Sequence, residues 1–167
     1  MLRDSTEALA ECLRQWLAAR MEGDGRATLR MQMGSELTEL HVELGQTLVL
    51  LGEVREAIEV LRRAYVLGGD SEVVNGLLVS LYEQVGDAAG ALPLVEWQAS
   101  QERGEAARAL WLHAGQLAEQ VGQWSRARDI YRKQAEQAPD DDEVALAVAR
   151  AHAGLGEIDR ALRLFDA

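Results

Sequence analysis

The fold is decided by one stretch, residues 112–139, whose sequence is LHAGQLAEQVGQWSRARDIYRKQAEQAP. Gly122 separates two runs of residues with good helix propensity, and Pro139 follows the second run. This pattern predicts a helix, a tight turn at Gly122 and a second helix that ends before Pro139. The stretch is therefore interpreted as one antiparallel pair of helices.

The same spacing returns along the rest of the chain. A turn glycine recurs at a nearly constant interval, an alanine follows each glycine at a fixed distance, and a bulky apolar residue stands one helical turn after each alanine. The members are Gly52, Ala57 and Leu61; Gly86, Ala91 and Val95; Gly122, Ala127 and Tyr131; Gly156, Ala161 and Phe165. Such an interval is typical of a helical repeat array.

The period also predicts how the two helices of a pair meet. Small or modest residues recur on the first helices, at Gly45, Val79, Gly115 and Ala149. We expect each to mark a close helix crossing, with the repeated alanine of the second helix facing it and larger side chains filling the next turns. In the clearest pair this places Gly115 against Ala127.

Composition and charge agree with an ordered helical protein. Of the 167 residues, 48% are hydrophobic and 27% charged, and only two are proline, which argues against a disordered chain. The formal charge of −11 argues against nonspecific nucleic-acid binding and against anionic membrane surfaces. No apolar run is long enough to span a membrane.

A single cysteine, Cys12, cannot form an internal disulfide and suggests a reducing compartment. Because it falls on the apolar face of the first helix, we expect a buried structural thiol. The N-terminus lacks the pattern of a secretory signal, so a cytoplasmic location is expected; a periplasmic protein whose signal had been removed would look the same. Lys133 is the only lysine beside many arginines, which suggests a GC-rich bacterial genome.

Local signals predict where several helices begin and end. Asp4 is expected to cap the first helix, whose apolar stripe is Leu9, Cys12, Leu13, Trp16 and Leu17. Gly34 and Ser35 are expected to end one helix and start the next, although one long helix passing through them is the alternative. Pro93 is expected in the first turn of a helix that starts near Gly90 or Ala91, with a kinked helix as the alternative. The interval between the second and third glycines is slightly longer than the others, and the insertion falls near 104–107, where a longer turn or one extra helical step would absorb it.

Residues 38–167 resemble the tetratricopeptide repeat family, whose unit is a pair of antiparallel helices about 34 residues long. Residues 108–141 match its pattern best, through Trp111, Ala114, Gly115, Ala118, Gly122, Ala127, Tyr131 and Pro139. The resemblance implies an all-α fold, a right-handed superhelical α-solenoid of about four helix pairs. The implied pairs are 38–71, 72–105, 108–141 and an incomplete 142–167, after an N-terminal helical extension, degenerate repeat or cap at 1–37.

The resemblance also implies a function, because the first helices of the family line a concave groove that binds a protein or peptide segment. Carried over by register, this partner-binding groove comprises Glu39, Val42, Glu43, Gln46, Leu77, Ser80, Glu83, Gln84, Leu112, His113, Gln116, Glu119, Gln120, Glu143, Ala147 and Arg150. The many glutamates predict a preference for a basic segment with an apolar anchor. The lysines and asparagines by which some members clamp a C-terminal dicarboxylate are absent from these positions.

No pattern in the sequence points to catalysis, a cofactor or a metal. The histidines 41, 113 and 152 lie in three different repeats, so packing or solvent exposure is the expected role of each. The run Asp140, Asp141 and Asp142 precedes a helix and is interpreted as an N-terminal cap. We therefore expect a protein-interaction scaffold that is not an enzyme. The alternative is a self-assembly or interdomain module, a homo-oligomer or a fragment of a larger repeat protein.

Overall fold

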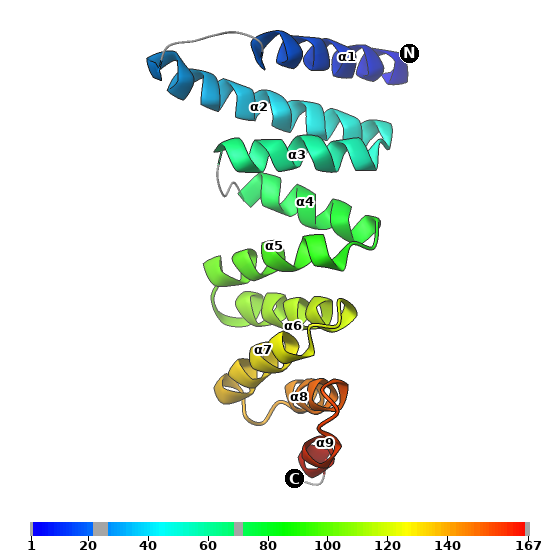
Figure 1. Cartoon of the computed structure of the whole chain (residues 1–167), viewed down its shortest axis with the longest axis vertical. Coiled ribbons are helices and arrows are strands. Elements are labelled where there is room, and N and C mark those ends of the chain that lie inside the picture. The colour runs from blue at the N-terminus through cyan, green and yellow to red at the C-terminus, as the bar shows by residue number, and fades with distance from the viewer. Residues whose placement is uncertain (1, 22–26, 69–71, 166–167) are drawn as a thin grey trace. The chain divides into compact units, whose positions relative to one another are not determined.

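The computed structural model describes the backbone of residues 2–21, 27–68 and 72–165, and the side chains of residues 6–19, 37–67 and 72–163. Every regular element within these residues is an α-helix (Figure 1), so the predicted all-α fold is confirmed. The chain divides into two compact units, which we call the N-terminal unit (Met1–Val85) and the C-terminal unit (Gly86–Ala167).

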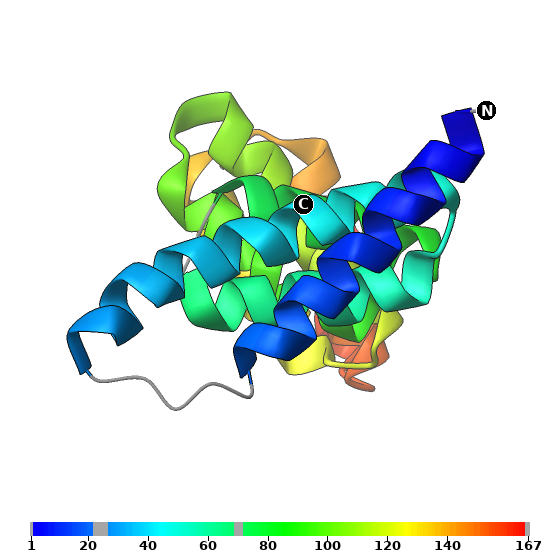
Figure 2. The same cartoon turned by 90° about the horizontal axis from the view of Figure 1, so that it is seen from above.

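The N-terminal unit contains four described helices, α1 (Leu2–Met21), α2 (Ala27–Leu51), α3 (Val54–Gly68) and α4 (Glu72–Gln84). α3 packs against both α2 and α4, and α1 packs against α2. Figure 2 shows α1 lying obliquely across α2. The helices α2 and α3 form the antiparallel pair predicted for the first repeat.

The C-terminal unit contains the described helices α5 (Ala88–Gln101), α6 (Gly104–Gln120), α7 (Trp124–Gln137), α8 (Asp142–Gly154) and α9 (Ile158–Phe165). Each packs against the next one along the chain. The pair α6 and α7 coincides with the stretch that decides the fold, and α8 and α9 form the pair after it. No helix in the described part of the chain is long and apolar enough to cross a membrane.

The four repeated glycines all make the predicted turns. Gly52, Gly86, Gly122 and Gly156 have φ angles of 79°, 72°, 73° and 78°, in the left-handed region that side chains rarely adopt. At Gly122 the turn is closed by the amide of Gln123, which donates to the carbonyl of Ala118 at 2.8 Å. This bond satisfies a carbonyl that the end of α6 would leave unpaired.

The close helix crossings form at the predicted glycines, but their partner is different. A Cβ atom at Gly115 would overlap the ring of Tyr131, and one at Gly45 would overlap the side chain of Leu61. The atoms nearest to each glycine therefore belong to the bulky residue of the repeated pattern and not to its alanine. Ala127, which was predicted to face Gly115, is fully buried, but the atoms nearest to Gly115 belong to Tyr131, one helical turn farther along α7.

Three of the predicted helix boundaries are wrong. α2 runs without interruption through residues 34 and 35, because apolar positions continue at helical spacing on both sides and an interior glycine costs a helix only about 1 kcal/mol. α1 begins at Leu2 instead of Asp4. α5 begins at Ala88, because the Asp87 carboxylate accepts a hydrogen bond from the amide of Gly90 at 2.9 Å and caps the helix. Pro93 consequently lies inside α5, beyond its first turn.

Cys12 is exposed, so the expectation of a buried thiol is wrong. The side chains of α1 that are buried are Ala10, Leu13 and Leu17, spaced by three and four residues. This buried face lies to one side of the predicted stripe, and Leu9 and Cys12 fall outside it.

The insertion before the third pair is absorbed by additional helix. Gly104, with a φ angle of 63°, begins α6 about one turn before the predicted start of the repeat at residue 108. Of the two expected alternatives, the structure therefore has the extra helical step and not the longer turn. The added turn places Glu105 and Arg108 beside the N-terminus of α8.

Candidate functional site

The predicted groove positions lie on four helices, α2 and α4 in the N-terminal unit and α6 and α8 in the C-terminal unit. We describe each unit separately. In the N-terminal unit most of these side chains are exposed, and only Val42 and Leu77 are half-buried. The exposed ones are Glu39, Glu43, Gln46, Ser80, Glu83 and Gln84.

In the C-terminal unit four predicted positions come together around one pocket. Leu112, His113 and Gln116 of α6 and Glu143 of α8 line a cavity of about 320 Å³. We call it the α6/α8 pocket. Of the remaining predicted positions, Ala147 is buried and Gln120 is exposed.

Three further residues line the same pocket and were not predicted as site residues: Glu105, Ala109 and Arg108. They lie on the first turns of α6, at and before the start of the repeat as the family pattern places it. The glycine at position 104 was the signal that could have located them, because a helix that begins there presents Glu105, Arg108, Leu112 and Gln116 on one face.

Two ion pairs join α6 to α8 and its N-cap, and of their four residues only Arg108 lines the pocket. Arg108 pairs with Asp141, which also caps α8 by accepting hydrogen bonds from the amides of Glu143 and Val144. Arg150 donates from Nε to both carboxylate oxygens of Glu119, at 2.8 and 3.0 Å. These hydrogen bonds raise the pKa of the Arg150 guanidinium above its usual value.

A third ion pair extends the same pattern to the second helices. Arg126 of α7 donates to Glu96 of α5 at 2.8 Å. In all three pairs the two partners lie close to one repeat period apart along the sequence. Each pair therefore joins equivalent helices of neighbouring repeats. A search for opposite charges about one period apart could have found all three.

Tyr131 lies behind the ion pair between Glu119 and Arg150. Its side chain is fully buried against Gly115, and burial, with a further contribution from the Glu119 carboxylate, raises the pKa of the Tyr131 hydroxyl well above its usual value. The hydroxyl makes no hydrogen bond of standard geometry with the described residues, although Glu119 and Arg150 lie close enough to affect its titration. The ring therefore acts mainly through its packing between α7 and Gly115 of α6.

The carboxylates around the pocket differ in how well they are neutralised. Glu119 forms an ion pair with Arg150, and Glu105 and Asp141 both form ion pairs with Arg108. The side chain of Glu143 is exposed and makes no ion pair within the described residues. The pocket therefore has a net negative rim in which Glu143 is the carboxylate available to a cation.

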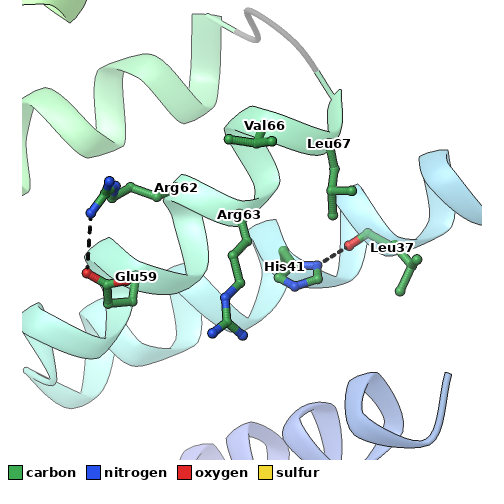
Figure 3. Close-up of a pocket in the computed structure, with 7 residues that line it drawn as sticks. All are labelled: Leu37, His41, Glu59, Arg62, Arg63, Val66 and Leu67. Carbon is green, nitrogen blue, oxygen red and sulfur yellow. Dashed lines mark hydrogen bonds and ion pairs between the residues drawn. The ribbon is translucent and has the colours of Figure 1, made fainter. Parts of the chain in front are cut away.

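A second pocket lies in the N-terminal unit, at a place that the sequence did not predict. It has a volume of about 560 Å³ and is lined by Leu37 and His41 of α2 and by Glu59, Arg62, Arg63, Val66 and Leu67 of α3 (Figure 3). We call it the α2/α3 pocket. Its histidine is buried, and Nδ1 of His41 donates to the carbonyl oxygen of Leu37 at 2.6 Å.

Two other residues that the sequence analysis considered for a chemical role, Asp141 and His152, have structural contacts in the fold. Asp141 is the helix cap predicted from the aspartate run. Nδ1 of His152 lies 2.7 Å from Oε2 of Glu157, and this hydrogen bond is the main reason that the pKa of Glu157 lies below its usual value. Among the described residues no group of three or more histidine, cysteine or acidic side chains is placed to hold a metal ion.

This arrangement of helices is similar to a known family and to several solved structures. Residues 108–151 match the family model described as tetratricopeptide repeat, which spans α6, α7 and most of α8. None of the curated proteins matches the sequence.

Several solved structures share the fold. A structure of MamA (MSR-1) is 21% identical with a TM-score of 0.54, and the match covers 98% of this chain and 90% of that one. For MamA (AMB-1) the identity is 22%, the TM-score 0.50, and the coverage 98% and 93%. A Podosopora anserina protein with nearly identical TPR-like repeats is 18% identical, with a TM-score of 0.53 and coverage of 96% and 84%.

Proposed function

We propose that the chain is a scaffold of the tetratricopeptide repeat type that binds a segment of another protein in the α6/α8 pocket. The observation that carries the proposal is that Leu112, His113, Gln116 and Glu143, four positions selected by register, line one cavity. Such repeats bind through the faces of their helices and need no catalytic group.

The chemistry of the pocket favours a basic segment with an apolar anchor. Leu112 supplies half-buried apolar surface, and His113 and Gln116 supply groups that can hydrogen-bond to a backbone or side chain. Glu143 presents a carboxylate without an ion-pair partner among the described residues. An Arg or Lys of the segment would therefore meet Glu143 while a neighbouring apolar side chain meets Leu112.

Rim charges of this kind act mainly on the rate of association. Because Debye screening acts over about 8 to 10 Å at physiological salt, binding should weaken as the salt concentration rises. The ion pair between Glu119 and Arg150 holds the helices together, so Glu119→Gln would disturb the fold as well as the charge. Glu143→Gln is the sharper variant.

The test begins with affinity capture of a partner by the wild-type chain and mapping of the bound segment. Association of that segment is then measured at low and high salt for the wild type, for Glu143→Gln and for Glu136→Gln. Glu136 is an exposed glutamate of α7 outside the pocket lining, so its variant has the same change in charge. We expect Glu143→Gln to weaken binding about two- to fivefold and to reduce its salt dependence. Equal effects of the two variants would move the site away from this pocket.

Exposed apolar side chains on the last two helices favour a second candidate function, self-assembly. Leu146 of α8 and Ile158 and Leu162 of α9 are each about half exposed. Phe165, which the sequence places on the same face, has a side chain outside the described residues. Light scattering over a concentration range tests this candidate, because a self-assembling chain gains mass with concentration and Leu162→Glu should abolish the gain.

A further inference from the structure

We propose that the α2/α3 pocket is a second interaction surface, and that it binds an acidic amphipathic helix of a partner protein. The surface lies wholly within the N-terminal unit and is independent of the function proposed for the α6/α8 pocket. Three observations carry the inference: the continuity of one stripe on α3, the exposure of its apolar members, and the sign of its charge.

The first observation is that α1 already occupies the beginning of this stripe. Glu56, Glu59, Arg63 and Val66 follow one another at intervals of three and four residues and share one face of α3. At Glu56 the stripe is bound by α1, because Arg14 donates from Nε and Nη2 to the two carboxylate oxygens at 2.7 and 2.8 Å. One turn farther along α3 the same stripe opens into the α2/α3 pocket. The stripe on α3 that binds α1 through this ion pair therefore continues beyond it.

The second observation is that the apolar residues at the far end of the stripe are uncovered. Val66 is 82% exposed and Leu67 is 48% exposed, and Leu37 of α2 lines the same pocket. The volume of about 560 Å³ falls within the range of specific binding pockets. An amphipathic helix laid in a groove presents apolar side chains at the spacing that such a stripe offers.

The third observation is that the pocket is cationic in an acidic protein. Arg62 pairs at 3.5 Å with Glu59, the only carboxylate among the described residues that line the pocket. Arg63 makes no ion pair with any residue that the structure describes, and Figure 3 shows it extending away from the Glu59 and Arg62 pair. The chain as a whole carries a formal charge of −11. The unpaired guanidinium selects an occupant with a carboxylate beside its apolar anchor, the opposite of the occupant expected in the α6/α8 pocket.

The probe for a direct test is a synthetic peptide of about five helical turns, acetylated and amidated, with leucines on one face and glutamates flanking them. A matched peptide carries lysine at every glutamate position. Binding of each fluorescently labelled peptide to the intact chain is measured by anisotropy. We expect saturable binding of the acidic peptide and at least about tenfold weaker binding of the basic one. Equal binding of the two, or no binding of the acidic peptide at about 100 μM, overturns the proposal.

Variants locate the site. Arg63→Glu should weaken binding of the acidic peptide about tenfold and strengthen binding of the basic peptide. Lys133→Glu makes the same change in net charge at an exposed position of α7 and should leave both affinities unchanged. Val66→Gln removes apolar contact at a position too exposed to affect folding, and should weaken both peptides. If Arg63→Glu and Lys133→Glu have equal effects, the preference is a nonspecific charge effect and the surface is not a site.

One further outcome would reassign the occupant. Light scattering of the wild type, Arg63→Glu and Val66→Gln without any peptide shows whether the surface seats a second copy of this chain. We expect the same mass for all three. A concentration-dependent gain in mass that both variants abolish would make the occupant another copy and overturn the assignment to a partner helix.

Discussion

Gly115 and Tyr131 set how closely α6 and α7 approach each other. The absence of a side chain at Gly115 creates the space that the tyrosine ring fills, and Gly45 and Leu61 repeat the arrangement between α2 and α3. The bulky residue follows the glycine at the same spacing along the chain in both pairs. A bulky side chain against a glycine therefore sets the helix crossing in two of the repeats.

The first prediction follows from this contact. Gly115→Ala would place a Cβ atom inside the ring of Tyr131, so the pair must separate or the ring must leave its rotamer. We expect a loss of about 1–3 kcal/mol in the free energy of unfolding, measured by urea denaturation. The matched control is Gly76→Ala in α4, where nothing lies within 4 Å of the added atom and a gain of about 0.5–1 kcal/mol is expected. A gain at both positions would contradict the contact.

Residue patterns predicted the turns well but not the partners across a helix crossing. A turn glycine is fixed locally, because only the left-handed backbone requires it. The residue that faces Gly115 depends on the rotation of α7 about its axis, which a spacing of apolar positions determines only coarsely. The rotation of α1 about its axis was equally uncertain, and for this reason Cys12 was wrongly predicted to be buried.

At the scale of the helix, α1 is fastened to the N-terminal unit by Arg14 and Glu56 as well as by its buried face. The hydrogen bonds from Arg14 lower the pKa of the Glu56 carboxyl below its usual value, against the opposing effect of partial burial. A lowered pKa in the folded state means that the ionised carboxylate stabilises the fold above the unfolded pKa. That stability is lost as the pH falls through the folded pKa.

The second prediction uses this titration. A dye attached to Cys12, the single and exposed cysteine of the chain, reports the docking of α1 through fluorescence anisotropy. We expect the anisotropy to fall on acidification from about pH 6 to pH 3, where carboxylates gain protons. Glu56→Gln should lower it already at neutral pH. Glu59→Gln, one turn farther along α3, should not, and a wild type that keeps its anisotropy throughout the acidification would contradict the role of the ion pair.

The helix boundaries show which competing effect decides a local structure. Gly34 and Ser35 carry good signals for a break, yet α2 continues through them. The continuous apolar spacing across the two residues outweighs the small propensity cost of one glycine. At α5 the opposite holds, since the local cap at Asp87 starts the helix before Pro93 and the proline is tolerated inside it.

At the scale of the whole chain, the repeat period predicted the order of the helices but not the division into compact units. The boundary between the units follows Val85 and falls inside the predicted second repeat, between α4 and α5. That repeat also departs from the family pattern at Gln98 and Arg103. A period treats every junction between helices as equal, so it cannot show where one compact unit ends and the next begins.

The third prediction concerns the C-terminal unit and its exposed apolar residues. Ile158 and Leu162 leave apolar surface on α9, and the apolar helix faces of a repeat array are normally covered by a neighbouring repeat or a cap. Fusing a polar capping helix after residue 167 should raise the unfolding midpoint and reduce any self-association, measured by thermal denaturation and light scattering. No change in either quantity would mean that this surface needs no cover.

The sequence predicted only some of the residues that line the two pockets. Leu112, His113, Gln116 and Glu143 were found because the family register assigns each one a face. Arg108 was missed because it lies at the first position of the repeat pattern, and the α2/α3 pocket because its lining combines side chains of two helices. The α2/α3 pocket leaves no periodic signal, whereas Arg108 could have been found from the opposite charge of Asp141 about one period away.

The central claim is that a protein segment binds in the α6/α8 pocket, and nuclear magnetic resonance of the isotope-labelled 18.3 kDa chain tests it most directly. The captured segment is titrated into the chain while the backbone amide signals are followed. The account predicts that the largest shifts fall on Leu112, His113, Gln116 and Glu143, and that Glu143→Gln reduces them at equal segment concentration. Shifts confined to α5 and α7, or to the N-terminal unit, would contradict it.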